Sequence, residues 1–230
     1  MKLLITSGGT SEKIDQVRSI TNHSTGQLGA LIAESFLAQG NQVTLITTQN
    51  AVKPAARPNL TIQIIENVQD LLETMQPLVK THGVLIHSMA VSDYTPIYMT
   101  GFEQITASQD LTEFLNKTND QGKISSKDEY QVLFLKQTPK IISQVKKWNP
   151  NIRLIGFKLL VDVSKEELLT VARASLAKNQ AEIIVANDLY DISNNQHHAY
   201  LVKENSVIEA NTKEEIAQQL VTHIHTKDNL

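Results

Sequence analysis

Side chains that donate or accept hydrogen bonds gather in one short run before a predicted helix. The run has no hydrophobic residue, and Arg18 stands about one helical turn before it; its members are Asn22, His23, Ser24, Thr25 and Gly26. Free N–H groups at a helix start favour a bound anion, and nearby hydroxyls add donors. Capping by Ser24 or Thr25 would need only one such residue. The surplus favours a phosphate or carboxylate site over a simple cap.

A glycine turn comes before this run. Residues 3–6 (Leu-Leu-Ile-Thr) predict a buried strand, and Gly8 and Gly9 follow it. Strand, glycine turn and helix begin many nucleotide- or phosphate-binding α/β folds. The glycines do not form the dinucleotide fingerprint, and no acidic residue follows the next strand to hold a ribose. A short-chain NAD(P)-dependent oxidoreductase is the alternative, but neither Tyr94 nor Tyr130 begins its Tyr-x-x-x-Lys pair.

Two further polar groups follow predicted strands. Residues 88–94 follow the strand at 83–87, and open α/β sheets bind ligands at the carboxyl ends of their strands. A small residue such as Ala90 lets the backbone approach a flat base, and Asp93 can accept a hydrogen bond from an amine or hydroxyl. A local cap by Asp93 is the alternative. Asn187 and Asp188 end a later strand, a weaker indication because Asn-Asp often ends strands.

Residues 95–130 interrupt the alternation of strands and helices. The segment is polar and contains one short predicted helix at 110–117, with Glu113 at a capping-box position. So long an insertion in a domain is functional or disordered, and we favour a lid or dimerisation arm over a mobile loop. Lys123 and Lys127 lie on it. Lysines on loops are usually solvated, and closure over a triphosphate is the functional alternative.

The remaining elements predict one domain over residues 1–230. Apolar runs predict further strands at 42–47, 60–65, 131–136, 153–158 and 181–186, and a hairpin at 198–203 and 207–210. Capping residues predict helices after Asn67, Thr138, Ser164 and Thr212. The helix after Thr138 is expected to reach about Trp148. The fold class is α/β: a Rossmann-like, doubly wound, mostly parallel sheet with an antiparallel extension.

Composition narrows the function classes. The 230 residues are 41% hydrophobic, carry a net charge of -3 and include no cysteine. The slight acidity argues against nucleic acid as a partner, and the lack of cysteine excludes thiolate catalysis and fits a cytoplasmic setting. No apolar run reaches the ~20 residues of a membrane span. The histidines form no metal-ligand spacing, so no metal bound by a side-chain cluster is expected.

Several of these motifs together resemble phosphopantothenate–cysteine ligase. The most specific are Thr-x-Gly-Gly-Thr at 6–10 and Asp-x-Val-Arg-x-Ile-x-Asn-x-Ser-x-Gly at 15–26. Further similar runs stand at 90–94, 123–124, 156–158 and 186–188 in the same order. Because the ligase-like motifs begin at residue 3, the chain resembles the stand-alone bacterial form.

The resemblance implies a reaction in coenzyme A biosynthesis. CTP, or ATP, with Mg²⁺ would activate the carboxylate of 4′-phosphopantothenate, and the amine of L-cysteine would then form the amide. It also implies a homodimer, and a separate phosphopantothenoylcysteine decarboxylase is a candidate partner.

The resemblance also implies residue roles. Asn22 would hold the acyl carbonyl, Arg18 would steer the carboxylate or intermediate, and the helix start at Gly26 would take phosphate from substrate or nucleotide. Lys123 would be the lid lysine, with Lys127 as the alternative. The nucleotide would contact Gly8, Gly9, Ala90, Asp93, Phe157, Asn187 and Asp188.

Overall fold

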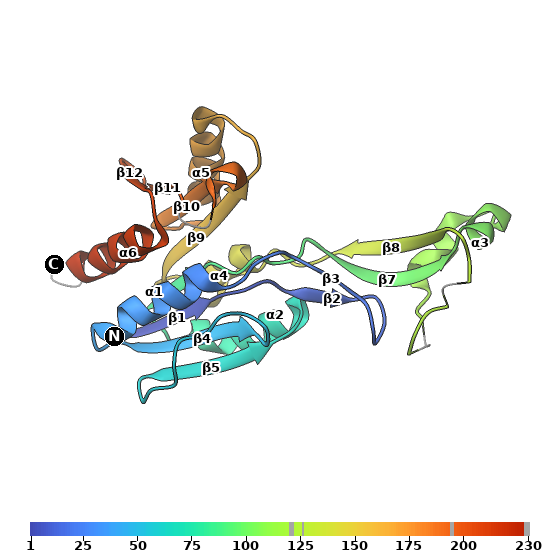
Figure 1. Ribbon diagram of the computed structural model, residues 1–230, viewed down its shortest axis with the longest axis horizontal. Helices are drawn as coiled ribbons and strands as arrows, with labels where there is room; N and C mark the ends of the chain where they lie inside the picture. The colour runs from blue at the N-terminus through green and yellow to red at the C-terminus, as the bar shows by residue number, and fades with distance from the viewer. Residues whose placement is uncertain (120–121, 126, 194–195, 228–230) are drawn as a thin grey trace.

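An eight-stranded sheet forms the body of the molecule in the computed structural model, which describes residues 1–119, 122–125, 127–193 and 196–227 (Figure 1). Its strands are short apolar segments, as buried strands of α/β proteins are. They are β1 (Lys2–Thr6), β4 (Gln42–Thr48), β5 (Leu60–Ile65), β6 (Val84–His87), β9 (Arg153–Leu160), β10 (Ile183–Asp188), β11 (Ala199–Val202) and β12 (Val207–Ala210).

The strand order is β12-β11-β10-β9-β6-β1-β4-β5. From β5 to β10 all neighbours are parallel, whereas β11 and β12 form an antiparallel hairpin on β10. This confirms the predicted doubly wound sheet with an antiparallel extension. The chain winds outward in opposite directions from β1 and β6, so the carboxyl ends of these two strands form the switch point, where such sheets bind ligands.

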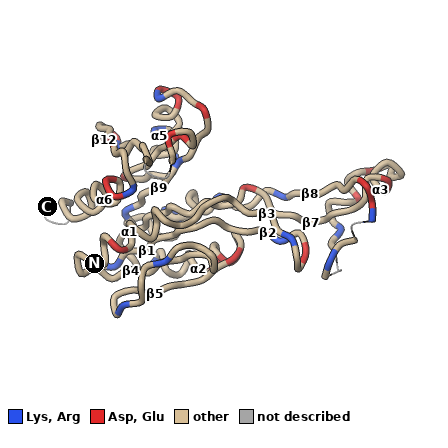
Figure 2. Tube along the Cα trace, in the orientation of Figure 1, with Lys and Arg blue, Asp and Glu red and all other residues tan. Residues whose placement is uncertain are grey.

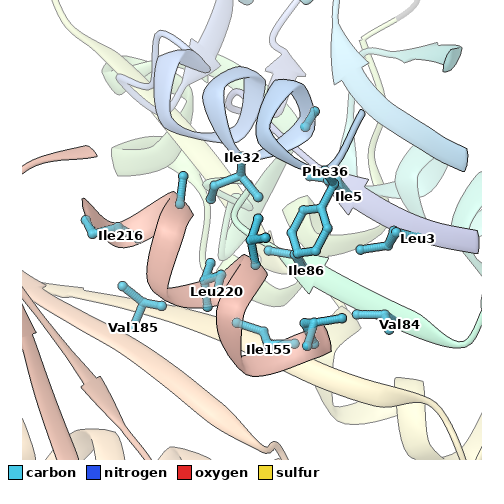
Figure 3. Packing of buried hydrophobic residues seen from close by; sticks show 14 of the residues in the cluster. Leu3, Ile5, Ile32, Phe36, Val84, Ile86, Ile155, Val185, Ile216 and Leu220 are labelled. Carbon is cyan, nitrogen blue, oxygen red and sulfur yellow. The ribbon is translucent and has the colours of Figure 1, made fainter. Parts of the chain in front are cut away.

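Helices cover both faces of the sheet. On one face α1 (Gln27–Ala38) and α6 (Lys213–Lys227) pack on alternate strand residues, and Phe36, Leu3 and Leu220 are fully buried there (Figure 3). The other face carries α2 (Val68–Val79), α4 (Val145–Trp148) and α5 (Lys165–Asn179). Each fully buried Leu, Ile or Phe stabilises the fold by roughly 1.5–3 kcal/mol, which anchors the strand ends that carry the site.

Most predicted helix boundaries are confirmed. Asn67 and Asp70 form a capping box at the start of α2, which continues through Pro77 to Val79. The Ser164 hydroxyl accepts the Glu167 N–H at the start of α5, and Thr212 plays the same part for α6. Gly40, at φ 76°, follows the end of α1 as the predicted left-handed residue.

The helix predicted after Thr138 is different. The chain forms a 3-10 helix, η2 (Ile141–Gln144), and only then the single turn α4. Thr138 does not cap it, because its hydroxyl donates to the Ser92 carbonyl at 2.5 Å. A tertiary hydrogen bond has therefore replaced the local cap, and the α-helical part is only four residues long.

The insertion at 95–130 is an ordered arm, although residues 120–121 and 126 lie outside the described part. Strand β7 (Tyr94–Gly101) pairs antiparallel with β8 (Gln131–Gln137) in a separate sheet that projects from the body (Figure 1). The strand predicted at 131–136 thus belongs to the arm. Between them lie α3 (Phe102–Ala107), which was not predicted, and the 3-10 helix η1 (Leu111–Asn116).

Two details of the arm explain its order. Phe114 and Phe134 stack at 5.4 Å between ring centroids, which gives the arm a small aromatic core. Glu113 does not complete the expected capping box, because its carboxylate accepts from the Ser108 hydroxyl at 2.7 Å. The segment therefore has secondary structure of its own, and its role as a lid or dimerisation arm stays a prediction.

A small hairpin lies beside the base of the arm. Strands β2 (Ser11–Lys13) and β3 (Ser19–Thr21) pair antiparallel in what the sequence suggested was a polar loop. The Glu12 carboxylate is buried and accepts the Val68 N–H at 2.8 Å, which fixes the hairpin to the start of α2. The remaining short element is the 3-10 helix η3 (Leu189–Asp191). Among the described residues, the helices are too short or too polar to cross a membrane.

Candidate functional site

The glycine turn after β1 pairs with the loop after β6 at the switch point. The Ala90 N–H donates to the Gly8 carbonyl at 2.9 Å, and the Thr10 N–H donates to the Ala90 carbonyl at 3.0 Å. Gly9 and Ala90 thus extend the parallel pairing beyond the strands themselves. Gly8, Gly9 and Ala90 together form what we call the floor of the switch point, in which Gly8 and Gly9 are buried and Ala90 is partly buried.

Asn22 lies directly against this floor. A Cβ added to Gly9 would stand 2.6 Å from the Asn22 carbonyl oxygen, so only glycine permits the contact. Asn22 is partly buried, and its side-chain amide has no hydrogen-bond partner among the described residues. The amide is therefore available to a ligand at the switch point.

The start of α1 differs from the starts of the other long helices in the described chain. Its N-cap is Gly26, at φ 76°, without a side-chain cap or an acidic residue in the first turn. Thr25 only accepts the Gln27 N–H at 3.4 Å, and Ser24 is exposed. By contrast α2, α5 and α6 each have a side-chain cap and acidic residues in the first turn. The uncompensated partial charge at the start of α1 favours an anion.

Ser7 holds this helix start against β1. Its hydroxyl donates to the Gly26 carbonyl at 3.0 Å. A Cβ on Gly29 would stand 2.3 Å from the Ser7 Oγ, so the helix approaches the strand because Gly29 has no side chain. Sequence reasoning missed the role of Ser7, although the Gly26-x-x-Gly29 spacing indicated close packing.

Buried hydroxyls and a histidine join the loops that follow β1 and β6. Sequence reasoning did not identify these residues. Thr6 Oγ1 lies 2.8 Å from His87 Nδ1 and accepts the Met89 N–H at 3.3 Å. Burial lowers the pKa of His87 to about 4, so this imidazole is neutral near pH 7. Thr10 and Ser92 are also hydrogen-bonded to each other across the loops. These contacts fix the position of the floor.

Asp93 is engaged by a lysine rather than capping locally. It forms an ion pair with Lys140, although the two side chains are 63% and 54% exposed. Asp93 and Phe157 both line a pocket of about 450 Å³ on the side of the sheet that α5 covers. The carboxylate remains accessible, so a ligand hydroxyl can reach it or compete with Lys140.

Asn187 and Asp188 are buried at the end of β10. The Asp188 carboxylate accepts the N–H groups of Val163 and Tyr190, each at 2.9 Å, and these bonds lower its pKa. Its charge therefore holds the loops after β9 and β10 together. The structure thus gives Asp188 a structural role beside the nucleotide contact predicted for it.

Arg18 lies at the tip of the β2–β3 hairpin and not beside Asn22. Because residues 19–21 are a strand rather than a helical turn, the four-residue separation from Asn22 spans about 13 Å. The Arg18 guanidinium binds the Asp15 carboxylate at 2.6 Å and the Ile124 carbonyl at 3.1 Å. Its hydrogen bond holds the pKa of Asp15 well below the usual range.

Lys123 belongs to the same group as Arg18. It is exposed on the segment that the hairpin tip contacts, since the Ile124 N–H also donates to Asp15 at 3.1 Å. Lys127 follows on the arm and is exposed too. Figure 2 shows basic and acidic residues close together at the hairpin tip and the neighbouring part of the arm. Within one chain the predicted residues therefore form two separate groups, one at the switch point and one at the hairpin tip.

The strand order defines a doubly wound α/β domain, a class whose sheets bind ligands at the switch point, where this chain has its glycine turn and open helix start. A family model for the DNA/pantothenate metabolism flavoprotein C-terminal domain matches residues 1–101 and 103–227. The chain belongs to this family, which confirms at that level the resemblance seen in the motifs.

Known proteins resemble the chain over nearly its whole length. The crystal structure of the DNA/pantothenate metabolism flavoprotein from Streptococcus pneumoniae has 61% identity and a TM-score of 0.95, with 99% of each chain covered. The C-terminal domain of coenzyme A biosynthesis bifunctional protein CoaBC has 27% identity and a TM-score of 0.74, with 99% of this chain and 95% of that chain covered.

A curated relative is the coenzyme A biosynthesis bifunctional protein CoaBC of Thermococcus kodakarensis. It is 31% identical over 221 residues, which is 95% of this chain and 49% of the relative. The chain spans about half the length of the curated relatives it matches.

Proposed function

We propose that the chain is a phosphopantothenate–cysteine ligase that serves coenzyme A biosynthesis in the cytoplasm. The observation that supports the proposal is the packing of the Asn22 backbone on Gly9 at the switch point of a domain of this family, with an Asn22 side-chain amide that has no partner among the described residues. A CTP- or ATP-dependent acyl transfer needs such an amide donor beside the phosphate site.

The first step is attack by the carboxylate of 4′-phosphopantothenate on the α-phosphorus of the nucleoside triphosphate. An acyl–phosphate bond forms, the bond to the β-phosphate oxygen breaks, and pyrophosphate leaves. The start of α1, with Ser24, Thr25 and Gly26, would stabilise phosphate charge through its N–H groups and hydroxyls. Catalysis here depends on positioning and charge neutralisation more than on a general base.

In the second step the amine of L-cysteine attacks the acyl carbon. The carbon–nitrogen bond forms, the nucleoside monophosphate leaves with the bonding electron pair, and the amine loses a proton. Negative charge develops on the carbonyl oxygen during the attack. The Asn22 amide N–H would donate to this oxygen and so lower the barrier, and the Asn22 backbone is packed against Gly9 at the switch point.

The nucleotide would lie along the floor formed by Gly8, Gly9 and Ala90, with Asp93 accepting from a hydroxyl or amine. Phe157, within β9, and Asn187, near the end of β10, would contact the base and ribose. Mg²⁺ would neutralise triphosphate charge. No group of three or more acidic or histidine side chains that could hold a metal occurs in the described part of the chain, so the phosphates would supply most of its ligands.

The separation of Arg18 and Lys123 from Asn22 supports a homodimer. Arg18 is about 13 Å of extended chain from Asn22 and its guanidinium is bound to Asp15 and Ile124, so in this proposal the arm of a second copy would carry Arg18 and Lys123 to the switch point. Mixing Asn22→Asp with Arg18→Ala chains, each inactive alone, should restore activity because a mixed dimer contains one intact site. No recovery in dimers shown by native mass spectrometry to be mixed would contradict the shared site. A separate phosphopantothenoylcysteine decarboxylase would consume the product.

Pyrophosphate release tests the reaction itself. The purified chain is incubated with 4′-phosphopantothenate and either CTP or ATP, with and without cysteine. Release should require 4′-phosphopantothenate and one of the two nucleotides, and the amide product should form only when cysteine is added. If neither nucleotide gives pyrophosphate, the ligase proposal is wrong.

A further inference from the structure

Helices α1 and α6 lie side by side and run in the same direction on one face of the sheet (Figure 3). Near their starts the Lys213 ammonium donates to Gln27 Oε1 at 3.2 Å, and near their ends Asn41 Nδ2 lies 3.2 Å from His225 Nε2. The positive ends of both helix dipoles therefore lie together at the edge of the sheet that carries the switch point. Negative charge between the two starts would relieve the repulsion between these ends.

Lys213 adds a further positive charge at this place. It is the first residue of α6, where the helix dipole makes a cation unfavourable. The residue is partly buried, and among the described residues its hydrogen-bond partner is the neutral Gln27 amide, with no carboxylate paired to it. By contrast Lys165, the first residue of α5, pairs with the Glu209 carboxylate at 2.5 Å. The charge of Lys213 is therefore left for an anion from outside the described chain.

His197 does not supply that anion or compete for it. Its imidazole is 8% exposed, and Nδ1 is buried without a hydrogen-bond partner in the described part of the chain. Burial, and then the charge of Lys213, lower the pKa of His197, so the ring is neutral near pH 7. Glu214 and Glu215 follow Lys213 in the same turn, but the Glu215 carboxylate accepts the Asn211 N–H at 2.7 Å. The space beside Lys213 thus keeps its positive character.

A buried amide points toward the same space. Along β10, Val185 packs against α6 beside Ile216 and Leu220 (Figure 3), and Ile183 belongs to the same cluster. Because side chains alternate along a strand, Asn187 lies on this face too, near the carboxyl end of β10 where the two helices begin. Asn187 is 6% exposed, and its amide has no hydrogen-bond partner among the described residues. A buried amide without a partner is costly, which indicates a ligand that supplies one.

We propose that Lys213 binds the phosphate group that lies at the open start of α1. The ammonium exchanges its bond to the neutral Gln27 amide for a charge-assisted bond to a phosphate oxygen, while the free N–H groups of α1 hold the other oxygens. The inference rests on the proposed function, since that phosphate belongs to the nucleotide or to 4′-phosphopantothenate. It adds a residue from the far end of the sequence to a site that otherwise comes from the first half of the chain.

Calorimetric titration of the full chain with CTP, ATP, 4′-phosphopantothenate and pyrophosphate tests this assignment. Lys213→Gln should weaken binding of the ligand at the start of α1 at least about tenfold, because charge-assisted bonds are about twice as strong as neutral ones. Lys213→Arg keeps the charge and should bind within about threefold of the wild type. An effect on a nucleotide alone assigns the site to the triphosphate, and an effect on 4′-phosphopantothenate alone assigns it to that substrate. Wild-type affinity of Lys213→Gln for all four ligands would overturn the proposal.

Lys165→Gln is the matched control, because Lys165 is also the first residue of a helix but lies on α5, over the other face of the sheet. It should leave every affinity within about twofold. An equal loss in Lys165→Gln and Lys213→Gln would overturn the proposal, since it would reflect only the lowered net charge.

Steady-state rates give a second readout. Lys213→Gln should raise the KM for the affected ligand at least about tenfold and leave kcat within about threefold, because the phosphate is bound equally in the ground state and the transition state. A lowered kcat with an unchanged KM would overturn the binding role. Pyrophosphate separates this inference from the proposed function. If pyrophosphate binding depends on Lys213 but neither the nucleotides nor 4′-phosphopantothenate bind, the phosphate site stands and the ligase proposal fails.

Discussion

Thr10 and Ser92 exchange two hydrogen bonds across the loops that follow β1 and β6. The Thr10 hydroxyl donates to Ser92 Oγ at 3.0 Å, and the Ser92 N–H donates to Thr10 Oγ1 at 2.9 Å. Both residues are buried, at 0% and 5% exposure. The pair therefore fixes the two halves of the switch point relative to each other, beneath Gly9 and Ala90.

Thr10→Val should destabilise the fold by about 1–3 kcal/mol, because the Ser92 N–H and hydroxyl would be left buried without partners. The valine has nearly the same shape, so lost packing contributes little. Urea unfolding measures the change. Ser11→Ala is the control, since that hydroxyl bonds Ser19 in an exposed position. Equal unfolding free energies for the two variants would show that the Thr10–Ser92 pair does not stabilise the switch point.

Gly9→Ala should fold but reduce amide formation at least about tenfold, because the new Cβ would stand 2.6 Å from the Asn22 carbonyl oxygen and displace Asn22. Gly83→Ala is the matched control. A Cβ at Gly83 has no atom within 4 Å, and its φ is not positive. The measurement is the steady-state rate of amide formation by each of the two variants. Full activity in Gly9→Ala would show that amide formation does not depend on the contact between Asn22 and Gly9.

Local patterns predicted the body of the fold well. The apolar runs identified every strand of the eight-stranded sheet, and the caps at Asn67 and Ser164 identified helix starts, because these signals depend on neighbours in sequence. The strand pairing inside the arm was not predicted, for the opposite reason. Tyr94 pairs with Gln137 across a long insertion, and no local pattern reports such a partner.

The site was predicted only in part, for the same physical reason. The glycine turn and the helix start are local features, and the structure places Gly8, Gly9, Asn22 and Gly26 together. Arg18 was expected about one helical turn from the polar run at Asn22, whereas the pairing of β2 with β3 makes the intervening residues an extended strand. Thr10, Ser92 and His87 act through contacts about eighty residues away in sequence, which only the fold brings together.

Asn22→Asp should leave the fold intact and reduce amide formation by about 10²–10³-fold, since a carboxylate repels the oxygen that the amide would stabilise. Pyrophosphate release should persist, so the acyl nucleotide should accumulate when cysteine is present. Quenched-flow chromatography separates the two steps. His23→Ala, at an exposed neighbouring position, is the control. Unchanged product formation would exclude Asn22 from the mechanism.

Stability should fall as the pH is lowered from 6.5 toward 4 because of His87. Its pKa falls from 6.5 in the unfolded chain to about 4 in the folded one, so the unfolded state binds more protons between these values. The contribution is fully present above pH 6.5, is lost as the pH falls toward 4, and amounts to about 3 kcal/mol. His87→Gln should remove this part of the pH dependence in urea unfolding. A variant with the wild-type slope would contradict the assignment.

Asp15→Asn should loosen the segment at 122–125 while leaving the body of the fold intact. The Asp15 carboxylate accepts from the Ile124 N–H at 3.1 Å and holds the Arg18 guanidinium, which itself donates to the Ile124 carbonyl. An amide lacks the charge that strengthens these bonds. Hydrogen exchange followed by mass spectrometry should therefore show faster exchange in the peptide that contains Ile124.

The control for this Asp15 clamp, meaning the bonds from Asp15 to Arg18 and Ile124, is a substitution on the same hairpin. Lys13→Gln breaks an ion pair with Glu66, a residue outside the arm, and both side chains are about half exposed. It should leave exchange around Ile124 unchanged, because exposed pairs contribute only about 0–1 kcal/mol. If amide hydrogens in the peptide that contains Ile124 exchange at the same rate in Asp15→Asn and Lys13→Gln, the hairpin tip does not hold the segment at 122–125, which carries Lys123. Arg18 and Lys123 would then have to reach a shared site independently, rather than as the one unit that the Asp15 clamp creates.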